Sequence, residues 1–432
     1  MINPLAQELN DILAETSIGK MFSDLGKRMY FPKGIIAQSG EAKTYGKVAN
    51  GTIGTTVING KTAILPSIQK QLPSLTSAEA VGYAQTAGVP ELQSLWKEKI
   101  IKKNPSLTGK LFSTPVVIPG LTAGISYLCD LFINEGETLL AADPSWDNYA
   151  LIVEARKNGV FKQFKMFKNG GFDMDSFENA LLEEAKTGKI RVILNFPQNP
   201  SGYSITKTEA DQICTILKDI AETGCTIMVW CDDAYFGLAY EENIEKESLF
   251  ARCIDLHENI IAVKIDGPTK EDYVWGFRTG FLTFGAKGLT QEHYDALYKK
   301  LMGVVRSSVS CASSPSQNLL IHALKDQDLP KEKEAMRNLL ESRYKKVRNF
   351  VDSKKDHAVL QPLPFNSGYF MSLECIGISA EALRVKLLHE KGIGTIAIDD
   401  NHLRIAFSSI DEDMIDTVYE AVYGAAEELA QN

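Results

Sequence analysis

The stretch IRVILNFPQNPSGYSITKTEADQICTILKDIAETGCTIMVWCDDAY, residues 190–235, predicts a strand, a helix and a second strand in succession. Both strand candidates are apolar runs without clear alternation, which is typical of strands that a sheet buries on both faces. The helical pattern between them ends at Gly224, and glycine commonly follows the last turn of a helix. These residues therefore indicate a βαβ unit with parallel strands.

The same alternation of apolar runs and helical patterns extends over residues 75–310. It predicts an α/β fold, a three-layer domain in which helices cover both faces of a mostly parallel sheet. Further strands are expected at 113–120, 137–143, 161–167, 259–266 and 278–285. Helices are expected at 122–132, 147–159, 174–188, 206–224 and 290–305.

The pattern changes after residue 315. A long charged helical region is followed by short strand and helix patterns, which predict a smaller α+β domain. We expect an N-terminal arm with part of the small domain at 1–70, a large domain at 71–315 and a small C-terminal domain at 316–432. The arm carries mixed signals, so it either completes the small domain or reaches a partner subunit.

The composition suits a globular protein, with 44% hydrophobic and 23% charged residues. A net charge of −9 argues against general binding to nucleic acid or to an acidic membrane, because both require a basic face. The start does not resemble a signal peptide and no apolar stretch reaches about 20 residues, so a cytoplasmic location is expected. The seven cysteines are dispersed and no Cys/His group has zinc spacing, which predicts reduced thiols and no metal.

Ligands of open α/β sheets bind beyond the carboxyl ends of the strands, and chemically suited residues follow the predicted strands here. The turn LTAGIS (121–126) has small residues that let an anion approach the first turn of a helix. The remaining candidates are Trp146, Asn199, Asp232, Tyr235 and Lys270, with Arg278 at the start of the last strand. Taken singly, each of these residues has an ordinary explanation as a turn, cap, core or solvated loop residue.

Together these positions place an anion cradle, an aromatic ring, an amide, a carboxylate, a phenol and two cations at one edge of one sheet. A planar cofactor with a phosphate and a cationic ring, bound through an imine, would use all of them. Pyridoxal 5′-phosphate has these properties, so it is the cofactor that the sequence predicts.

Six motifs in order span most of the chain: YAQTAGVPE (83–91), PSWDNY (144–149), NPSG (199–202), DDAY (232–235), Lys270 with Arg278, and LRIAF (403–407). They resemble the motifs of the fold-type I, pyridoxal-phosphate-dependent aminotransferases of class I/II, the aspartate aminotransferase superfamily. The resemblance implies the fold-type I architecture, with a large cofactor-binding domain and a smaller α+β domain.

The resemblance implies that Lys270 forms the imine with the cofactor and then acts as the base that moves the substrate proton. Asp232 would keep the ring nitrogen protonated. Tyr235 and Asn199 would hydrogen-bond the phenolate oxygen, and Trp146 would stack on the ring.

The phosphate would be held by backbone and turn contacts and by a forked cation. The expected contacts are Ala123, Gly124, Ile125, Thr269 and Arg278. The family often has serine or threonine three residues before the lysine, whereas this chain has Gly267, so its phosphate cup is expected to differ. Tyr83 would reach the phosphate of the neighbouring subunit, which implies a homodimer.

Arg404 would bind the substrate α-carboxylate through two hydrogen bonds. Trp146, Asn199 and the backbone of Gly54 would line the rest of the substrate pocket. Arg306 lies near the place where dicarboxylate-specific relatives put a second arginine from the partner chain, which would favour aspartate, glutamate or a related acid. Its alternative role is that of a cation at a helix C-terminus, where the helix dipole favours it.

The leading hypothesis is an aminotransferase that exchanges an amino group between an L-amino acid and a 2-oxo acid by a ping-pong mechanism. The alternatives are a carbon–sulfur lyase or other β-lyase on the same fold, and a non-catalytic ligand-sensing module. A cofactor-free nucleotide-binding protein is disfavoured, because neither G-x-G-x-x-G nor G-x-x-x-x-G-K-[ST] follows a predicted strand.

Overall fold

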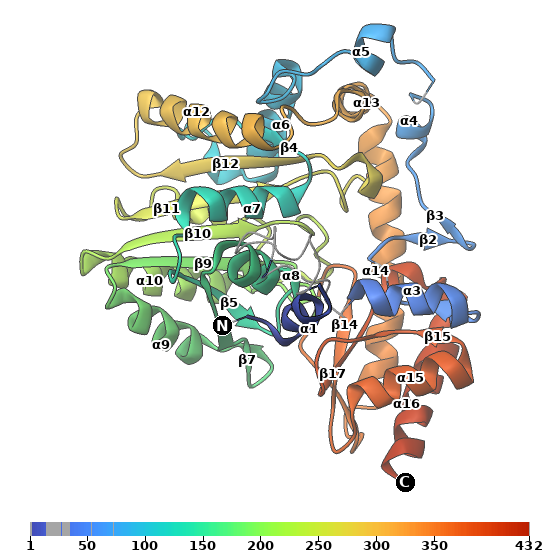
Figure 1. Cartoon of the computed structure of the whole chain (residues 1–432). Helices are drawn as coiled ribbons and strands as arrows, with labels where there is room; N and C mark the ends of the chain where they lie inside the picture. Colours follow the sequence, from blue (N-terminus) through green and yellow to red (C-terminus); the bar gives the residue numbers. More distant parts are fainter. Residues whose placement is uncertain (1, 14–26, 28–34, 53, 72, 432) are drawn as a thin grey trace.

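A seven-stranded sheet lies at the centre of the computed structural model, which describes residues 2–13, 27, 35–52, 54–71 and 73–431 (Figure 1). Its strands are β4 (Val116–Ile118), β5 (Thr138–Asp143), β6 (Val160–Lys165), β9 (Lys189–Asn195), β10 (Thr226–Asp232), β11 (Ile260–Asp266) and β12 (Gly280–Ala286). Their order is β4-β12-β11-β10-β9-β5-β6. β12 pairs antiparallel with both neighbours and the remaining pairs are parallel, so the predicted mostly parallel sheet is confirmed.

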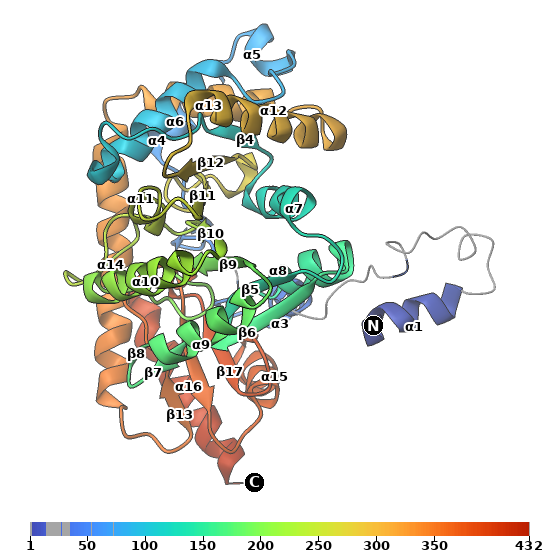
Figure 2. The same ribbon diagram turned by 90° about the vertical axis from the view of Figure 1, so that its left-hand side faces the viewer.

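Helices cover both faces of this sheet, as Figure 2 shows for α7 on one side and α10 on the other. One face holds α7 (Leu121–Phe132), the π-helical segment Leu151–Arg156 and α12 (Gln291–Ser308). The opposite face holds α6 (Pro90–Lys103), α9 (Met174–Ala185), α10 (Lys207–Glu222) and α11 (Leu249–Cys253). In β10, Val229 packs into one layer and Trp230 into the other, which explains why its sequence is apolar without alternation.

The smaller sheet is antiparallel, with the order β13-β14-β17-β16. Its strands are β13 (Leu360–Pro362), β14 (Met371–Cys375), β16 (Ile396–Ala397) and β17 (His402–Ile405). It shares an apolar core with α14 (Leu329–Ser353), α15 (Ala380–Lys391) and α16 (Ile415–Ala430). The expected α+β part is therefore present.

The charged region predicted as helical over 315–353 consists of two helices. α13 (Ser314–Leu324) packs on α6, and its Leu320 and Ile321 join the core of the large sheet. α14 starts at Leu329, with Pro330 in its first turn, and runs from beside α13 down to the smaller sheet (Figure 1). By its packing α13 lies with the large domain, although the sequence-based boundary of 315/316 places most of it in the small one.

Part of the N-terminal arm packs against the small domain. β1 (Ala49–Asn50) pairs in parallel with β15 (Ile393–Gly394), and α3 (Ile35–Tyr45) lies against β15 and β16. The first helix, α1 (Pro4–Leu13), stands away from the body of the chain in Figure 2. The remaining short elements are β2 (Val57–Ile58), β3 (Lys61–Thr62), α4 (Pro66–Gln69), α5 (Ser77–Val81), α8 (Asn148–Ala150), β7 (Phe167–Lys168) and β8 (Gly171–Phe172).

Among the described residues, no helix combines the length and the apolar character needed to cross a membrane.

Candidate active site

A cavity of about 140 Å³ lies beyond the carboxyl ends of β9, β10 and β11. This is the edge at which open α/β sheets bind their ligands. The residues from the sequence prediction that line it are Ile125, Trp146, Asn199, Asp232, Tyr235, Thr269, Lys270 and Arg278.

Asp232 is the last residue of β10 and is buried at the base of this cavity. The Tyr149 hydroxyl donates to its Oδ2, and the Ala234 N–H donates to its Oδ1 at 3.2 Å. Burial raises the pKa of Asp232 to about 6, although the Tyr149 hydrogen bond and the charge of Lys270 act in the opposite direction. A carboxylate in this setting is stabilised in its charged form by a cation beside it.

Tyr149 and Asn195 are neighbours of Asp232 that the sequence reasoning does not single out. The Tyr149 ring also packs edge-on against Trp146, with 5.4 Å between ring centroids. The Asn195 side chain donates to the Asp232 carbonyl at 2.7 Å and accepts from the Asn199 N–H at 2.8 Å. Both had a signal in the sequence, since Tyr149 closes the PSWDNY motif and Asn195 is a polar residue near the end of an apolar strand.

Lys270 lies four residues after β11 and projects its amine into the cavity. Its Nζ is 4.8 Å from the centroid of the Tyr235 ring, and the Tyr369 hydroxyl donates to its carbonyl at 2.8 Å. Burial lowers the pKa of Lys270 to about 8, with Arg278 acting in the same direction and Asp232 against it. An amine with this pKa is partly neutral near pH 8, which a nucleophile or a general base requires.

Lys264, in the preceding strand, has the opposite environment. It is buried and forms ion pairs with Asp233 and, at 3.6 Å, with Asp266. Although burial alone would lower it, these carboxylates hold the pKa of Lys264 above its ordinary value. Lys264 is therefore a structural ammonium group, and Lys270 is the reactive candidate.

The positively charged end of the cavity is formed by the start of α7 and by Arg278. Gly120 precedes the helix with φ +89°, and a Cβ there would lie 2.5 Å from Arg278 Nη2. Glycine at this position lets the guanidinium group lie against the helix start. Arg278 itself has φ +49°, and its Nη1 donates to the Trp275 carbonyl at 3.2 Å.

At this end the cavity is lined by the predicted Ile125 and also by two residues that precede the predicted stretch. Leu121 and Thr122 line the cavity, whereas Ala123 and Gly124 do not. The Gly124 N–H donates to the Gly120 carbonyl within the helix, and a Cβ at Gly124 would meet Ile118 at 2.3 Å. Only the first N–H groups of a helix are free for an anion, so Gly124 serves helix–sheet packing.

Arg404 of β17 is buried next to the cavity. Its Nη1 donates to Asn199 Oδ1 at 2.7 Å and its Nη2 to the Thr52 carbonyl at 2.9 Å. Its guanidinium carbon lies 4.3 Å from the Phe370 ring centroid. The buried Nε has no hydrogen-bond partner among the described residues, which indicates capacity for a further acceptor.

Gly54 lies in the same corner. A Cβ at Gly54 would be 2.7 Å from the Phe370 ring and 3.5 Å from the Tyr235 hydroxyl. A side chain at position 54 would therefore press on the Phe370 ring, which Arg404 contacts from its own side, and glycine avoids this clash.

Two predicted site residues lie away from the cavity of their own chain. Tyr83 is 97% exposed, and Arg306 is exposed in the last turn of α12. Either residue would need a second subunit to meet a cavity of this kind.

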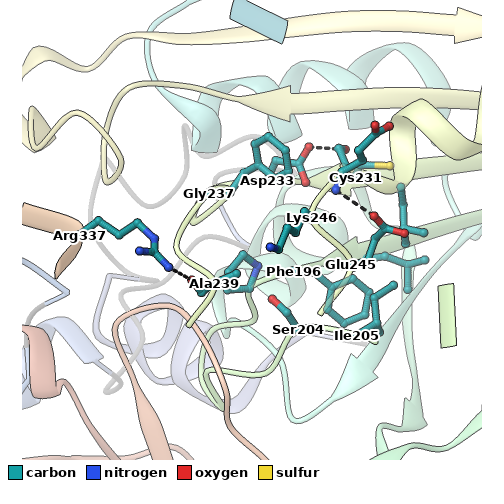
Figure 3. A pocket seen from close by; sticks show the side chains of 16 residues that line it. Phe196, Ser204, Ile205, Cys231, Asp233, Gly237, Ala239, Glu245, Lys246 and Arg337 are labelled. Atoms are coloured by element: carbon teal, nitrogen blue, oxygen red, sulfur yellow. Dashed lines mark hydrogen bonds between the residues drawn. The ribbon is translucent and has the colours of Figure 1, made fainter. Parts of the chain in front are cut away.

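A second cavity, of about 300 Å³, lies between the ends of β9 and β10 and the residues preceding α11 (Figure 3). Its carboxylates are already partnered: Asp233 with Ser248 and Lys264, and Glu245 with Arg252. Arg337 reaches its rim and donates to the Ala239 carbonyl at 2.9 Å. Lys246 supplies an amine to this cavity, but Asp233 and Glu245 are already engaged, so the first cavity is the candidate active site.

Over the ranges that the structure describes, no three His, Cys, Asp or Glu side chains are grouped so that they could hold a metal ion.

Comparison with known proteins agrees with this geometry. The model of the family described as aminotransferase class I and II matches residues 55–422, and the chain belongs to this family. It is 23% identical to an aspartate aminotransferase of Sulfurisphaera tokodaii, over 77% of this chain and 79% of the relative. It is 22% identical to a probable N-acetyl-LL-diaminopimelate aminotransferase of Bacillus subtilis, over 76% of this chain and 77% of the relative. The crystal structure of an aminotransferase from Anaerococcus prevotii has a similar fold, with a TM-score of 0.83 and 23% sequence identity. The match covers 94% of this chain and 99% of that one.

The protein is therefore an enzyme of the fold-type I aminotransferases, which use pyridoxal 5′-phosphate. The cavity fits this cofactor. Asp232 is a buried carboxylate that forms no ion pair within the described part of the chain, Gly120 makes room for Arg278 at a helix N-terminus, and Lys270 supplies an amine.

Proposed function

We propose that Lys270 is the residue to which the cofactor is attached, that Asp232 lies beside its ring nitrogen, and that Arg404 binds the substrate α-carboxylate. One observation carries this assignment. An amine with a pKa of about 8, a buried carboxylate and a guanidinium group whose Nε has no partner among the described residues converge on one cavity and its rim. Few arrangements other than an amino-acid site use these three groups together.

The cofactor, when bound, supplies a ring that withdraws electrons from the Cα–H bond of the amino acid. Lys270, once the substrate amine has displaced it from the cofactor, would take the proton from the substrate Cα and return it in a 1,3-proton shift. Asp232 would hold the proton on the ring nitrogen, and Arg404 would orient the substrate so that its Cα–H bond faces Lys270. Tyr235, Asn199 and Trp146 would contact the ring, while Ile125, Thr269, Arg278 and the start of α7 would hold the phosphate.

We further propose that the amino donor is an acidic L-amino acid such as aspartate or glutamate and that the acceptor is a 2-oxo acid. Relatives named as aspartate aminotransferases support this choice, as does the exposed position of Arg306, from which it could serve a neighbouring subunit. A carbon–sulfur lyase on the same fold is the rival activity.

The test is the visible spectrum of the cofactor-loaded protein before and after addition of L-aspartate, L-glutamate or L-alanine. We expect the lysine-bound absorbance to bleach most readily with an acidic amino acid and to return when 2-oxoglutarate is added. In Arg306→Ala, bleaching by the acidic amino acids should slow by about 10–100-fold, the value of one lost charged hydrogen bond, while alanine is unaffected. An equal effect on alanine would contradict the role of Arg306, and pyruvate with ammonia in the absence of an acceptor would indicate the lyase.

We also propose a homodimer in which Tyr83 and Arg306 reach the active site of the partner subunit. The exposure of these two residues and of Val81, together with the position of α1 away from the body, supports it. Sedimentation equilibrium should give twice the 47.7 kDa chain mass, and Tyr83→Phe should weaken cofactor binding about 10-fold without changing that mass. A monomer that retains full cofactor affinity would contradict the proposal. A cytoplasmic location is in keeping with seven cysteines that are all free.

A further inference from the structure

Two carboxylates follow Lys270 directly in the chain, and both are held by lysines from other elements. Asp272 is 1% exposed and pairs with Lys99 of α6 and Lys333 of α14, at 2.6 Å in each case. Glu271 pairs with Lys103 of α6, with Lys333 at 3.2 Å and with Lys99 at 3.5 Å. We call these five residues the lysine cluster.

Backbone hydrogen bonds close the turn that presents Lys270. The Asp272 N–H donates to the Pro268 carbonyl at 2.9 Å, and the Val274 N–H donates to the Thr269 carbonyl at 3.1 Å. The backbone alone can form such a turn, so the turn does not require two buried carboxylates. Burying charge is costly unless it is paired, which indicates that these pairs serve a purpose beyond the turn.

The two helices that supply the lysines connect the turn to both domains. α6 packs on the large sheet, and α14 runs into the small domain. Further along α14, Arg343 donates to the carbonyls of Ser408 and Val57 at 2.6 Å each, and Ser408 lies four residues after Arg404. One helix therefore joins the turn of Lys270 to the segment that carries Arg404.

The charges in the lysine cluster do not cancel, because three ammonium groups face two carboxylates. Although burial acts against it, Lys333 and Lys99 hold the pKa of Asp272 below its ordinary value. Burial and the neighbouring ammonium groups lower the pKa of Lys103 to about 8, with Glu271 acting against them. Without the lysines, the two carboxylates that follow Lys270 would add negative charge to its turn, and negative charge favours the protonated form of an amine.

We propose that the lysine cluster is a positioning device for Lys270, which fixes its turn between α6 and α14 and neutralises the two carboxylates that follow Lys270 in that turn. This inference rests on the proposed role of Lys270. The other charged or titratable groups that face the amine are Asp232, Tyr235 and Arg278. Around the lysine cluster, Glu98 and Lys102 lie at its rim and the Lys264–Asp233–Asp266 group lies beyond Phe236.

The test is a pH titration of the visible absorbance of the cofactor-loaded protein, which follows the proton on the Lys270 nitrogen. Lys333→Met removes a positive charge, so the midpoint should rise by about 0.5–1 pH unit. Asp272→Asn removes a negative charge, so the midpoint should fall by a similar amount. In the double variant both charges are absent, and the midpoint should return toward that of the wild type.

Opposite shifts separate a charge role from a merely structural one, because disorder of the turn would move both variants in the same direction. Lys331→Met is the matched control, since Lys331 is exposed on the same helix and outside the lysine cluster. If either buried variant fails to fold, Lys103→Met and Glu271→Gln form a second pair at more exposed positions.

Cofactor affinity, measured by equilibrium dialysis, is the second readout and should fall several-fold in each single variant. Shifts that are absent or of the same sign, with wild-type affinity, would overturn the proposal. Lys270→Ala distinguishes the two levels of inference. If that variant keeps the lysine-bound absorbance, the assignment of Lys270 fails and the lysine cluster proposal fails with it. If the absorbance is lost but the cluster variants do not shift, only the lysine cluster proposal fails.

Discussion

Replacement of Lys270 by alanine is expected to abolish the lysine-bound absorbance and to reduce turnover by at least about 10²–10⁴-fold, the usual contribution of a general base. The reason is local. The side chain of Lys270 brings an amine into this cavity, and its pKa of about 8 leaves a fraction of the amine groups neutral near that pH. The measurements are a visible spectrum with added cofactor and the rate of amino transfer to 2-oxoglutarate.

Lys264 provides the contrasting control. Lys264→Met leaves Asp233 as a buried carboxylate without its ion pair, so unfolding should require about 3–5 kcal/mol less free energy. Lys270→Ala should leave the free energy of unfolding nearly unchanged, because Lys270 forms no ion pair among the described residues. If Lys270→Ala keeps both the absorbance and turnover, the reactive lysine lies elsewhere.

Asp232→Asn is expected to reduce turnover by about 10²–10⁴-fold while the lysine-bound absorbance remains. An amide cannot supply the negative charge that holds a proton on the ring nitrogen. Tyr149→Phe is the milder comparison, because it removes only one hydrogen bond from Asp232 and should cost about 10-fold. An unchanged rate in Asp232→Asn would contradict the role of this carboxylate.

The pH dependence of cofactor binding gives an independent check on Asp232. Burial raises its pKa to about 6 in the cofactor-free chain, and a cation beside it would lower that pKa. Below about pH 6 the Asp232 carboxyl is protonated in the cofactor-free chain and must lose that proton when the cofactor binds. Cofactor affinity should therefore weaken as the pH falls through about 6. Asp232→Asn should not show this loss of affinity at low pH. The contribution of Asp232 is the difference between the pH profiles of cofactor affinity measured for the wild type and for the variant.

Much of the fold could be predicted from the sequence because its signals are local. The apolar strand β10 and the glycine after α10 mark a buried parallel strand and a helix end, and neither depends on distant contacts. The antiparallel direction of β12 was not predictable in this way, because strand direction is set by pairing with β4 and β11. The division of the region after residue 315 into α13 and α14 likewise reflects packing on two different cores.

The candidate site shows the same division. Asp232, Lys270 and Arg278 were predicted because each follows or precedes a strand in a motif of fixed spacing. Thr122 rather than Gly124 lines the cavity, because α7 begins at Leu121 and only its first N–H groups remain free. Tyr149 became visible as a partner of Asp232 only in the folded chain, where β5 and β10 lie on either side of β9 in the sheet.

The sequence by itself determined the class of fold and the cofactor and supplied the candidates for the reactive groups, because residue types and short spacings carry this information. Only the tertiary structure showed how differently two nearby lysines are placed. Lys264 and Lys270 lie six residues apart, yet one is buried between carboxylates and remains charged, while the other faces a cavity and loses its proton more easily. Burial and the distance to neighbouring charges set that difference, and both arise only when the chain is folded.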